Sequence, residues 1–433
     1  MTFRNLAYGA SAVAIMMSAS TAAFAQETTG GVAGGVYDAS GAPIAGATVT
    51  VVHAPSGTTS TTMTDANGQF SVRSLRVGGP YVVTSTSPAG DAAAQVPSIG
   101  IGTPVSIELV VEGAQANAAD LGDIVVTGAR AGGLRTSPRS NLNLADIETL
   151  PSIGRDIKDI VRTTPFATTD PTNNDALSIG GQNTRYNAIL IDGVRQSDDF
   201  GLNGNGYPSI NTPISRSVLQ AVSVDVAPYG VQYGTFTGGV VNMVTKSGGN
   251  DFHGEVFWEK TDDGLRGDSF SYKDFVTGER QNRTLNGEFE EKSWGATLSG
   301  PIIQDRLFFL LNYEKFESTQ PVLSGPEGSG AVNEVAGITQ AQIDQVREIA
   351  QRVYGYDALD WRADALEVQD EKYFAKLDWN INDQHRAVFS YQQTEGSDLR
   401  LNNTVTSGSS KWVSYHAIAS FEADLWLEGI LTN

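Results

Sequence analysis

The stretch that decides the fold of the last part of this chain is Tyr373–Asn382, which reads YFAKLDWNIN. Apolar and polar residues alternate along it, apart from Phe374 on the otherwise polar face. A period of two predicts a β-strand with one apolar face and one polar face. Five other segments between residues 249 and 433 repeat the pattern, with aromatic residues near their ends. We therefore expect about six long, two-faced strands in this part of the chain.

Strands of this kind suit either a water-soluble sandwich or the wall of a membrane barrel. Their length favours the barrel, because it approaches the roughly 9–11 residues that a tilted spanning strand needs. We also expect their polar faces to stay wet over the whole length. Short turns such as Asn382–Gln384 alternate with long inserts at Thr261–Arg283 and Glu317–Gln369. Outer-membrane barrels show this difference between their periplasmic and extracellular ends.

The second long insert contains one predicted helix. Thr339 and Gln342 have the spacing of a capping box, and Gly355 marks the end of the helix. We expect this helix to pack on a loop rather than to form a ligand site. Its apolar face consists of Ile343, Val346, Ile349, Ala350 and Val353.

The first 25 residues predict a secretory signal. Arg4 precedes a short apolar run at Leu6–Met17, and Ala23–Ala25 has the small residues of a cleavage site, so we expect the mature chain to begin at Gln26. The apolar run is shorter than a spanning helix requires. The chain has no cysteine, which excludes disulfides and thiol chemistry. Its formal net charge of −20 argues against a nucleic-acid partner.

Residues 26–112 predict a small all-β sandwich, with short β-rich runs between turn-forming residues. We expect Asp65 and Asn67 to form a hairpin turn rather than a calcium loop, because the downstream glutamate of such a loop is missing. The segments Gly41–Val49 and Thr64–Phe70 resemble the carboxypeptidase regulatory-like domain, a transthyretin-type sandwich. That resemblance implies no peptidase activity, although such folds are grouped with carbohydrate-binding modules.

Residues 113–140 predict a linker around a short β-prone hexapeptide. Ala, Gly and Asn precede the hexapeptide, and Gly, Arg, Ser and Pro follow it. A β-prone segment between two flexible tethers suits pairing with the sheet edge of another protein. The hexapeptide resembles the TonB box of TonB-dependent outer-membrane receptors, and consists of Asp123, Ile124, Val125, Val126, Thr127 and Gly128.

Residues 141–248 predict a mixed α/β domain. Ile157, Ile160 and Val161 have helical spacing before Pro165, and Tyr186–Asp192 predicts a strand that ends in an Asp-Gly turn. The domain resembles the plug of TonB-dependent transporters, and with Asn250–Gly254 the resemblance narrows to the Oar-like subgroup, which also carries an N-terminal sandwich. The motifs that carry the plug resemblance are Leu177–Asn183, Leu190–Val194 and Tyr233–Gly248.

The expected fold class is therefore mainly β: a transthyretin/Ig-like sandwich, a mixed α/β plug, and the first strands of an antiparallel transmembrane barrel over residues 249–433. The chain departs from the family pattern at two places, the hexapeptide and the C-terminal part. The hexapeptide follows the sandwich, and six strands are far fewer than the 22 of plugged transporters. The chain also ends without a terminal aromatic residue. We interpret it as an N-terminal fragment or a truncated gene product.

The resemblance implies a mechanism and partners. TonB, with its inner-membrane energising complex, would bind Asp123–Gly128 and pull on the plug, while the barrel contacts outer-membrane lipid. An extracellular ligand of unknown identity would bind plug apices and long loops, and no cofactor or metal is implied. The stretch Asp198–Tyr207 is the best candidate for an apical loop. The candidate ligand-binding residues are Arg185, Tyr186, Asp198, Asp199 and Tyr207.

Three other interpretations compete with a transporter. We do not expect an enzyme, because no nucleophile motif occurs and the four histidines (His53, His253, His385 and His416) lack metal-site spacing. A cell-surface adhesin or carbohydrate-binding outer-membrane protein remains open, as does a non-functional truncated receptor. The sequence also leaves the ligand and the direction of transport open.

Overall fold

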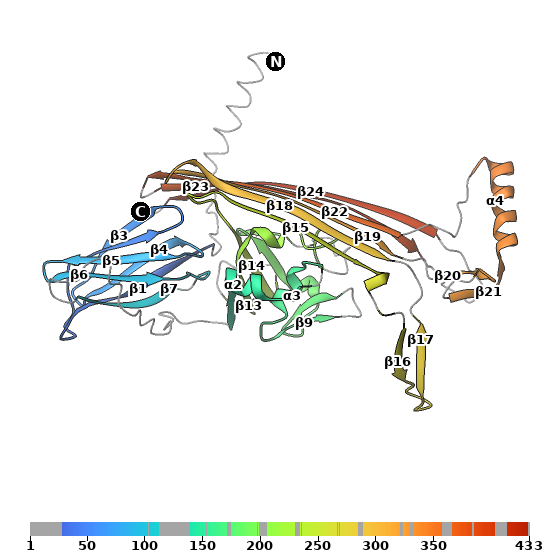
Figure 1. Ribbon diagram of the computed structural model, residues 1–433, viewed down its shortest axis with the longest axis horizontal. Helices are drawn as coiled ribbons and strands as arrows, with labels where there is room; N and C mark the ends of the chain where they lie inside the picture. The colour runs from blue at the N-terminus through green and yellow to red at the C-terminus, as the bar shows by residue number, and fades with distance from the viewer. Residues whose placement is uncertain are drawn as a thin grey trace, which may run out of the picture.

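The computed structural model describes residues 28–111 and 138–431, apart from residues 103, 153, 171–174, 197, 199–205, 230–233, 235, 266, 268, 285–288, 321–323, 330–332, 357–365, 383–384 and 403–413. The described chain folds into a small sandwich, a compact mixed domain and one long sheet (Figure 1). The sandwich and the mixed domain lie on the same side of the long sheet.

The first part is a two-sheet sandwich with strand orders β4-β1-β7 and β3-β2-β5-β6. Alternate residues of both sheets fill its core, including Val36, Val49 and Tyr81. Asp65 Oδ1 accepts the backbone N–H groups of Asn67 and Gln69, which confirms a turn at this position. It is not the predicted hairpin turn, because the strands that it joins, β3 and β4, belong to different sheets. The strands are β1 (Thr29–Asp38), β2 (Thr48–His53), β3 (Thr58–Met63), β4 (Gln69–Arg76), β5 (Tyr81–Ser87), β6 (Gly90–Val96) and β7 (Pro104–Val111).

The second part is built on a five-stranded sheet with the order β12-β11-β14-β13-β8. Strand β8 begins at Arg139, so the last residues of the predicted linker belong to this sheet. The elements are β8 (Arg139–Leu142), α2 (Leu144–Thr149), α3 (Ile157–Val161), β9 (Ala167–Asp170), β10 (Ala176–Ile179), η1 (Thr184–Tyr186), β11 (Ala188–Ile191), β12 (Val194–Arg195), η2 (Arg216–Val218), β13 (Leu219–Val226) and β14 (Gly239–Thr245).

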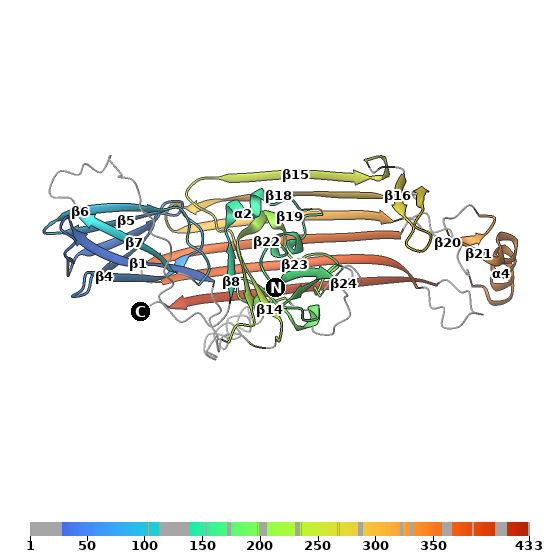
Figure 2. The ribbon, with the colours of Figure 1, turned by 90° about the horizontal axis from the view of Figure 1, so that it is seen from below.

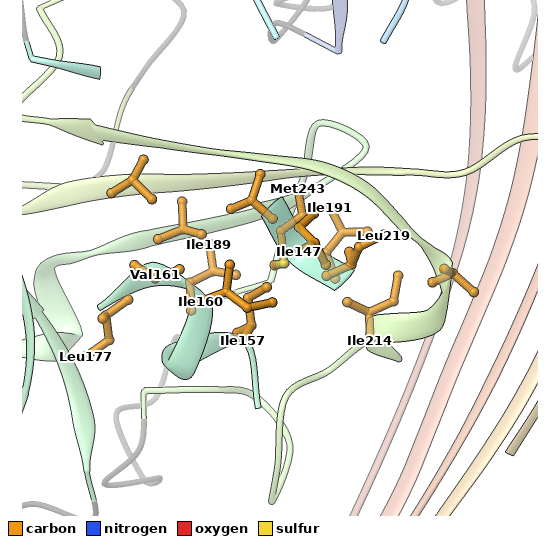
Figure 3. Close-up of a cluster of buried hydrophobic side chains, with 14 of the residues drawn as sticks. Ile147, Ile157, Ile160, Val161, Leu177, Ile189, Ile191, Ile214, Leu219 and Met243 are labelled. Carbon is orange, nitrogen blue, oxygen red and sulfur yellow. The ribbon is translucent and has the colours of Figure 1, made fainter. Parts of the chain in front are cut away.

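One face of this sheet carries the core of the mixed domain. Figure 3 shows Ile147 of α2, Ile157 and Ile160 of α3, and Met243 of β14 among the side chains that converge there. Gly239 permits close packing at the start of β14, since a Cβ at this position would stand 2.4 Å from Ile179 Cγ2. This contact gives a physical reason for a glycine in the motif Tyr233–Gly248.

The third part is a six-stranded antiparallel sheet with the order β15-β18-β19-β22-β23-β24, which we call the wall (Figure 2). It contains the six predicted strands, and five of them have 14 to 18 residues, longer than expected. The strands are β15 (His253–Asp262), β18 (Glu290–Ile303), β19 (Leu307–Gln320), β22 (Leu366–Asn382), β23 (His385–Asn402) and β24 (Ser414–Leu431).

The long inserts leave the wall at the end opposite the sandwich (Figure 1). The first contains η3 (Asp263–Leu265) and a hairpin of β16 (Ser269–Lys273) and β17 (Arg280–Thr284). The second contains β20 (Ser324–Glu327), β21 (Asn333–Thr339) and α4 (Gln340–Tyr354).

Helix α4 has the predicted ends but not the predicted packing. The backbone N–H of Thr339 donates to Gln342 Oε1, and Gly355 ends the helix with φ 64°. Among the described residues, however, none of α4 is buried, and Val346, Ile349 and Val353 are exposed. The expectation that the helix packs on a loop is therefore wrong here, because the insert extends beyond the wall.

Candidate functional site

The two faces of β22 have opposite environments. Tyr373, Leu377 and Trp379 point outward and are 37%, 42% and 50% exposed. On the opposite face, Lys376 and Asp378 are 5% and 1% exposed, and they contact the mixed domain and the sandwich respectively. The outward face is the apolar one, which suits contact with lipid. The expectation that the polar faces stay wet is wrong for these residues, because the mixed domain and the sandwich cover them.

The first contact between the mixed domain and the wall is centred on Glu314 of β19. This carboxylate is 2% exposed and accepts a hydrogen bond from Lys372 Nζ at 2.8 Å. From the mixed domain, Ser215 Oγ donates to Glu314 Oε2 at 2.6 Å, and Arg155 Nε lies 3.6 Å from the same oxygen. Nearby, the backbone N–H of Asn211 donates to Asp370 Oδ2 at 3.1 Å.

The second contact joins Asp192 of the mixed domain to Lys376 of β22. Asp192 follows β11 in the predicted Asp-Gly turn, with φ 46°, and Gly193 continues it with φ 86°. The backbone N–H of Thr245 donates to Asp192 Oδ1 at 2.9 Å. Lys376 Nζ donates to Asp192 Oδ2 at 3.1 Å and to Thr245 Oγ1 at 2.8 Å. The turn therefore presents a carboxylate to the wall, and the wall supplies the cation.

These contacts hold the mixed domain in place mainly through polar groups. Leu310 and Phe374 of the wall add an apolar contact to its core. Ion pairs differ from apolar contacts because water restores most of their energy when both partners become hydrated. The arrangement can therefore hold a domain firmly in a fixed position and still let water replace its contacts when the domain moves.

The described residues also limit the chemistry. Within them, no group of three or more His, Asp or Glu side chains is placed to hold a metal ion. No helix in the same residues is long and apolar enough to cross a membrane.

Family comparisons identify each of the three parts. Residues 31–112 match the carboxypeptidase regulatory-like domain, and residues 134–241 match the TonB-dependent receptor plug domain. Residues 244–345 match an outer-membrane β-barrel domain. The plug and barrel segments thus match those of TonB-dependent outer-membrane receptors, and on these matches we refer to the chain as the receptor. It is a protein of the outer membrane, and the mixed domain is its plug.

Known relatives of this receptor are transporters and receptors of the same kind. It is 29% identical to the TonB-dependent transporter Oar of Myxococcus xanthus over 253 residues, which are 56% of this chain and 21% of Oar. It is 28% identical to the probable TonB-dependent siderophore receptor PirA of Acinetobacter baumannii over 201 residues, 43% of this chain and 24% of PirA. The matched segments thus span about a quarter or less of these relatives.

Solved structures of outer-membrane transporters are also similar to the receptor. The transporter YddB of Escherichia coli matches with a TM-score of 0.43 and 16% identity, over 60% of this chain and 33% of YddB. The siderophore receptor PirA of Acinetobacter baumannii matches with a TM-score of 0.37 and 18% identity, over 67% and 44%.

The predicted site residues of the receptor lie in different environments. The hexapeptide Asp123–Gly128 and Asp199 lie outside the described residues. Arg185 and Tyr186 lie in η1 and are exposed, with Asn183 capping the turn through its side chain. Asp198 is half-buried. The ligand-binding role of Arg185, Tyr186 and Asp198 stays a prediction.

Tyr207 has a position that does not suit a ligand contact. Its side chain is 1% exposed, and its hydroxyl donates to Asp156 Oδ1 at 2.8 Å. Burial, and then the charge of Asp156, raises the pKa of Tyr207 well above its ordinary value. Its ring belongs to the plug core, so the expectation that Tyr207 contacts ligand requires correction: in this structure it stabilises α3.

Sequence reasoning missed the charged pairs between plug and wall. It placed Lys376 and Asp192 in their elements but did not bring them together, and it assigned no contact to Glu314. One signal was available: charged residues on the inner face of a strand that surrounds a plug must be buried, and buried charges need partners.

Proposed function

We propose that this receptor moves a ligand across the outer membrane with energy that TonB delivers to the plug. TonB would pair with Asp123–Gly128 as an added strand, supported from the inner membrane by its energising complex. This makes the chain a transporter rather than an enzyme.

The observation that supports this proposal most directly is the set of polar contacts between the plug and the wall. Asp192 meets Lys376, and Ser215 meets Glu314, on a wall whose outward face is apolar. A plug that only had to stay in place would be held as well by apolar packing. Contacts that water can replace suit a domain that must shift under a pull.

The ends of the wall support an assignment of sides. The turn at Asp305 lies at the sandwich end, where Asn250 Nδ2 donates to Asp305 Oδ1 at 2.7 Å. The long inserts leave the opposite end (Figure 1). Short turns mark the periplasmic end of outer-membrane barrels. We therefore place the sandwich in the periplasm, which disfavours an adhesin, since an adhesin would need the sandwich outside the cell.

The ligand would approach from the insert end. Arg185 and Tyr186 remain candidates because they are exposed on the plug, and Asp198 remains a third. Asp199 stays a sequence-based candidate. The chemistry of these side chains suits a polar or aromatic ligand without selecting one.

The test of the proposal is capture of the purified periplasmic domain of TonB by the full chain in detergent. Val125→Pro removes a backbone donor and the extended pairing geometry, so we expect binding to fall at least about tenfold. Ala118→Pro is the matched control, because it lies in the same connecting segment outside the hexapeptide. Equal capture by the Val125→Pro and unaltered proteins would refute the assigned role of the hexapeptide.

A further inference from the structure

The sandwich docks on both the plug and the wall. On the plug side, Val77 and Ile101 of the sandwich form a small buried apolar cluster with Ala221 and Val244. Ala221 and Val244 pair across β13 and β14. They occupy the face of the plug sheet opposite to its core, because their neighbours Val222 and Met243 belong to that core.

On the wall side, Arg76 of β4 inserts its guanidinium group between two strands. Its Nη1 and Nη2 donate to the Asp378 carboxylate, and Nη2 also donates to Asn380 Oδ1 at 2.7 Å. Arg386 of β23 donates to the same carboxylate through Nε at 3.0 Å and Nη2 at 2.7 Å. The guanidinium carbon of Arg76 lies 5.9 Å from the centre of the Phe308 ring, within the range of a cation–π contact.

Further hydrogen bonds between described residues add to the interface. The backbone N–H of Asn250 donates to the Pro55 carbonyl at 2.7 Å, and Asn380 Nδ2 donates to Thr58 Oγ1 at 3.0 Å. From β8, Asn141 Nδ2 lies 3.5 Å from the Ile101 carbonyl. In the part of the chain that the structure describes, the interface thus combines one four-residue apolar cluster, one buried charge cluster and these hydrogen bonds.

Both partners of this interface are complete without it. The sandwich has its own core around Val36 and Tyr81, and the plug has a separate core around Ile160 and Met243. Domains with separate cores and a small polar interface move relative to one another as folded units. The sandwich could therefore leave without unfolding itself or the plug.

The order of elements along the chain gives such a movement a direction. The last sandwich strand ends at Val111, and the first plug strand begins at Arg139. In sequence, the hexapeptide Asp123–Gly128 stands between these two anchors. Strand β7 contributes Ile107 and Leu109 to the sandwich core, so a pull that reaches Val111 acts on the sandwich as a whole.

We propose that the sandwich is a releasable cap on the plug and the wall. It leaves them as a folded unit, and Arg76 is the latch that sets how often it leaves. The interface contacts come from the structure alone. The force that would release the sandwich rests on the proposed function. Release uncovers the face of the plug sheet that carries Ala221 and Val244.

The test uses thiol labelling of the full chain in cells, because the natural sequence has no cysteine. Ala221→Cys places one thiol under the cap, and Val222→Cys places one in the plug core on the adjacent residue. With N-ethylmaleimide, we expect Ala221→Cys to react at least about tenfold faster than Val222→Cys. Equal rates would mean that the plug unfolds, and no reaction at residue 221 would mean that the sandwich stays docked; either result overturns the proposal.

A second substitution tests the latch. Arg76→Ala leaves Asp378 paired with Arg386, and we expect it to raise the labelling of Ala221→Cys at least about tenfold. Arg73→Ala, an exposed arginine on the same strand, should leave the rate unchanged. If Arg76→Ala also leaves it unchanged, Arg76 is not the latch.

An uncoupler separates this inference from the proposed function. If labelling of Ala221→Cys falls when the inner membrane is depolarised, the energised TonB system drives release. If labelling persists while Val222→Cys stays protected, the inference that the sandwich is released as a folded unit holds. The proposed coupling of TonB energy to this receptor then fails.

Discussion

Lys376 shows how single residues hold the plug in this receptor. Its ammonium group lies among three oxygen atoms, from Asp192, Thr245 Oγ1 and the Thr245 carbonyl. The wall supplies the cation and the plug supplies every one of these acceptors. A buried charge of this kind contributes little when both partners are exchanged for apolar groups, but removing one partner leaves the other charge uncompensated.

Lys376→Met tests this asymmetry. The substitution leaves the Asp192 carboxylate buried against an apolar chain, so we expect the plug to lose about 3–5 kcal/mol of docking free energy. The double substitution Asp192→Asn and Lys376→Met should recover most of that loss. Protease digestion of the plug in the detergent-solubilised full chain measures both, and an equally sensitive double variant would contradict the pairing.

His53 gives the sandwich a dependence on pH. Burial, and then the positive charges of Arg76 and Arg386, lowers the pKa of His53 to about 3. The unfolded chain binds a proton near pH 6.5, whereas the folded sandwich does not until far lower pH. The contribution of the neutral His53 to the stability of the sandwich is therefore fully present above pH 6.5 and is lost as the pH falls below this value.

We expect the unfolding free energy of the sandwich to fall by up to about 2 kcal/mol between pH 7 and pH 5 because of His53. His53→Gln should remove this part of the acid sensitivity. Hydrogen exchange at the amides of β2 and β4 measures the change in the full chain. A His53→Gln variant with the same loss on acidification would show that other groups cause it.

At the scale of elements, β22 separates lipid from protein with a single alternating pattern. Its register with β19 runs without interruption from Leu307↔Trp379 to Gln320↔Leu366. The pairing places Phe309 beside Leu377 on the outward face and Phe308 beside Asp378 on the inward face. A slip by one residue would exchange these faces and send charged side chains into lipid.

Leu377→Lys tests the outward face. A lysine on the lipid-facing side of a barrel strand costs about 2–4 kcal/mol near the middle of the bilayer and less near its edges. We expect lower yield of folded protein in the outer membrane, measured by its resistance to protease. Thr277→Lys, in the exposed turn of the β16–β17 hairpin, adds the same charge and should assemble normally.

How much was predictable from sequence depended on the kind of pattern. Alternation in Tyr373–Asn382 was sufficient to predict the wall, and the capping residues of α4 were sufficient to predict its ends. Strand β3 (Thr58–Met63) carries no such pattern, because its residues are nearly all polar. The contact of Arg76 with Asp378 joins residues about 300 positions apart, and no local pattern carries that information.

At the scale of the whole molecule, the sandwich, the plug and the wall are three folded parts that contact one another. The sandwich touches the plug sheet beside β8, where the backbone at Gly100 approaches Asn141. A Cβ at Gly100 would stand 3.8 Å from Asn141 Cβ. This separation matches the average Cβ–Cβ distance of natural disulfides, which is about 3.8 Å.

The double substitution Gly100→Cys and Asn141→Cys should therefore form a disulfide under oxidising conditions. Because the chain has no other cysteine, the pairing is unique. We expect up to about 4 kcal/mol of stabilisation from closing the loop between the two positions. A shift of the urea midpoint that dithiothreitol reverses is the measurement, and two free thiols after oxidation would contradict the docked arrangement.

The charged inward face of the wall has a consequence for biogenesis. Lys376 finds its counterion on the plug, and Asp378 pairs with Arg76 of the sandwich as well as with Arg386 of the wall. The plug and the sandwich both precede the wall in the chain. A polypeptide delivered from its N-terminus presents Asp192 and Arg76 before the strand that needs them is synthesised. We expect the folded sandwich and plug to serve as an internal template, so that the wall is assembled around them and the plug does not enter a preformed barrel.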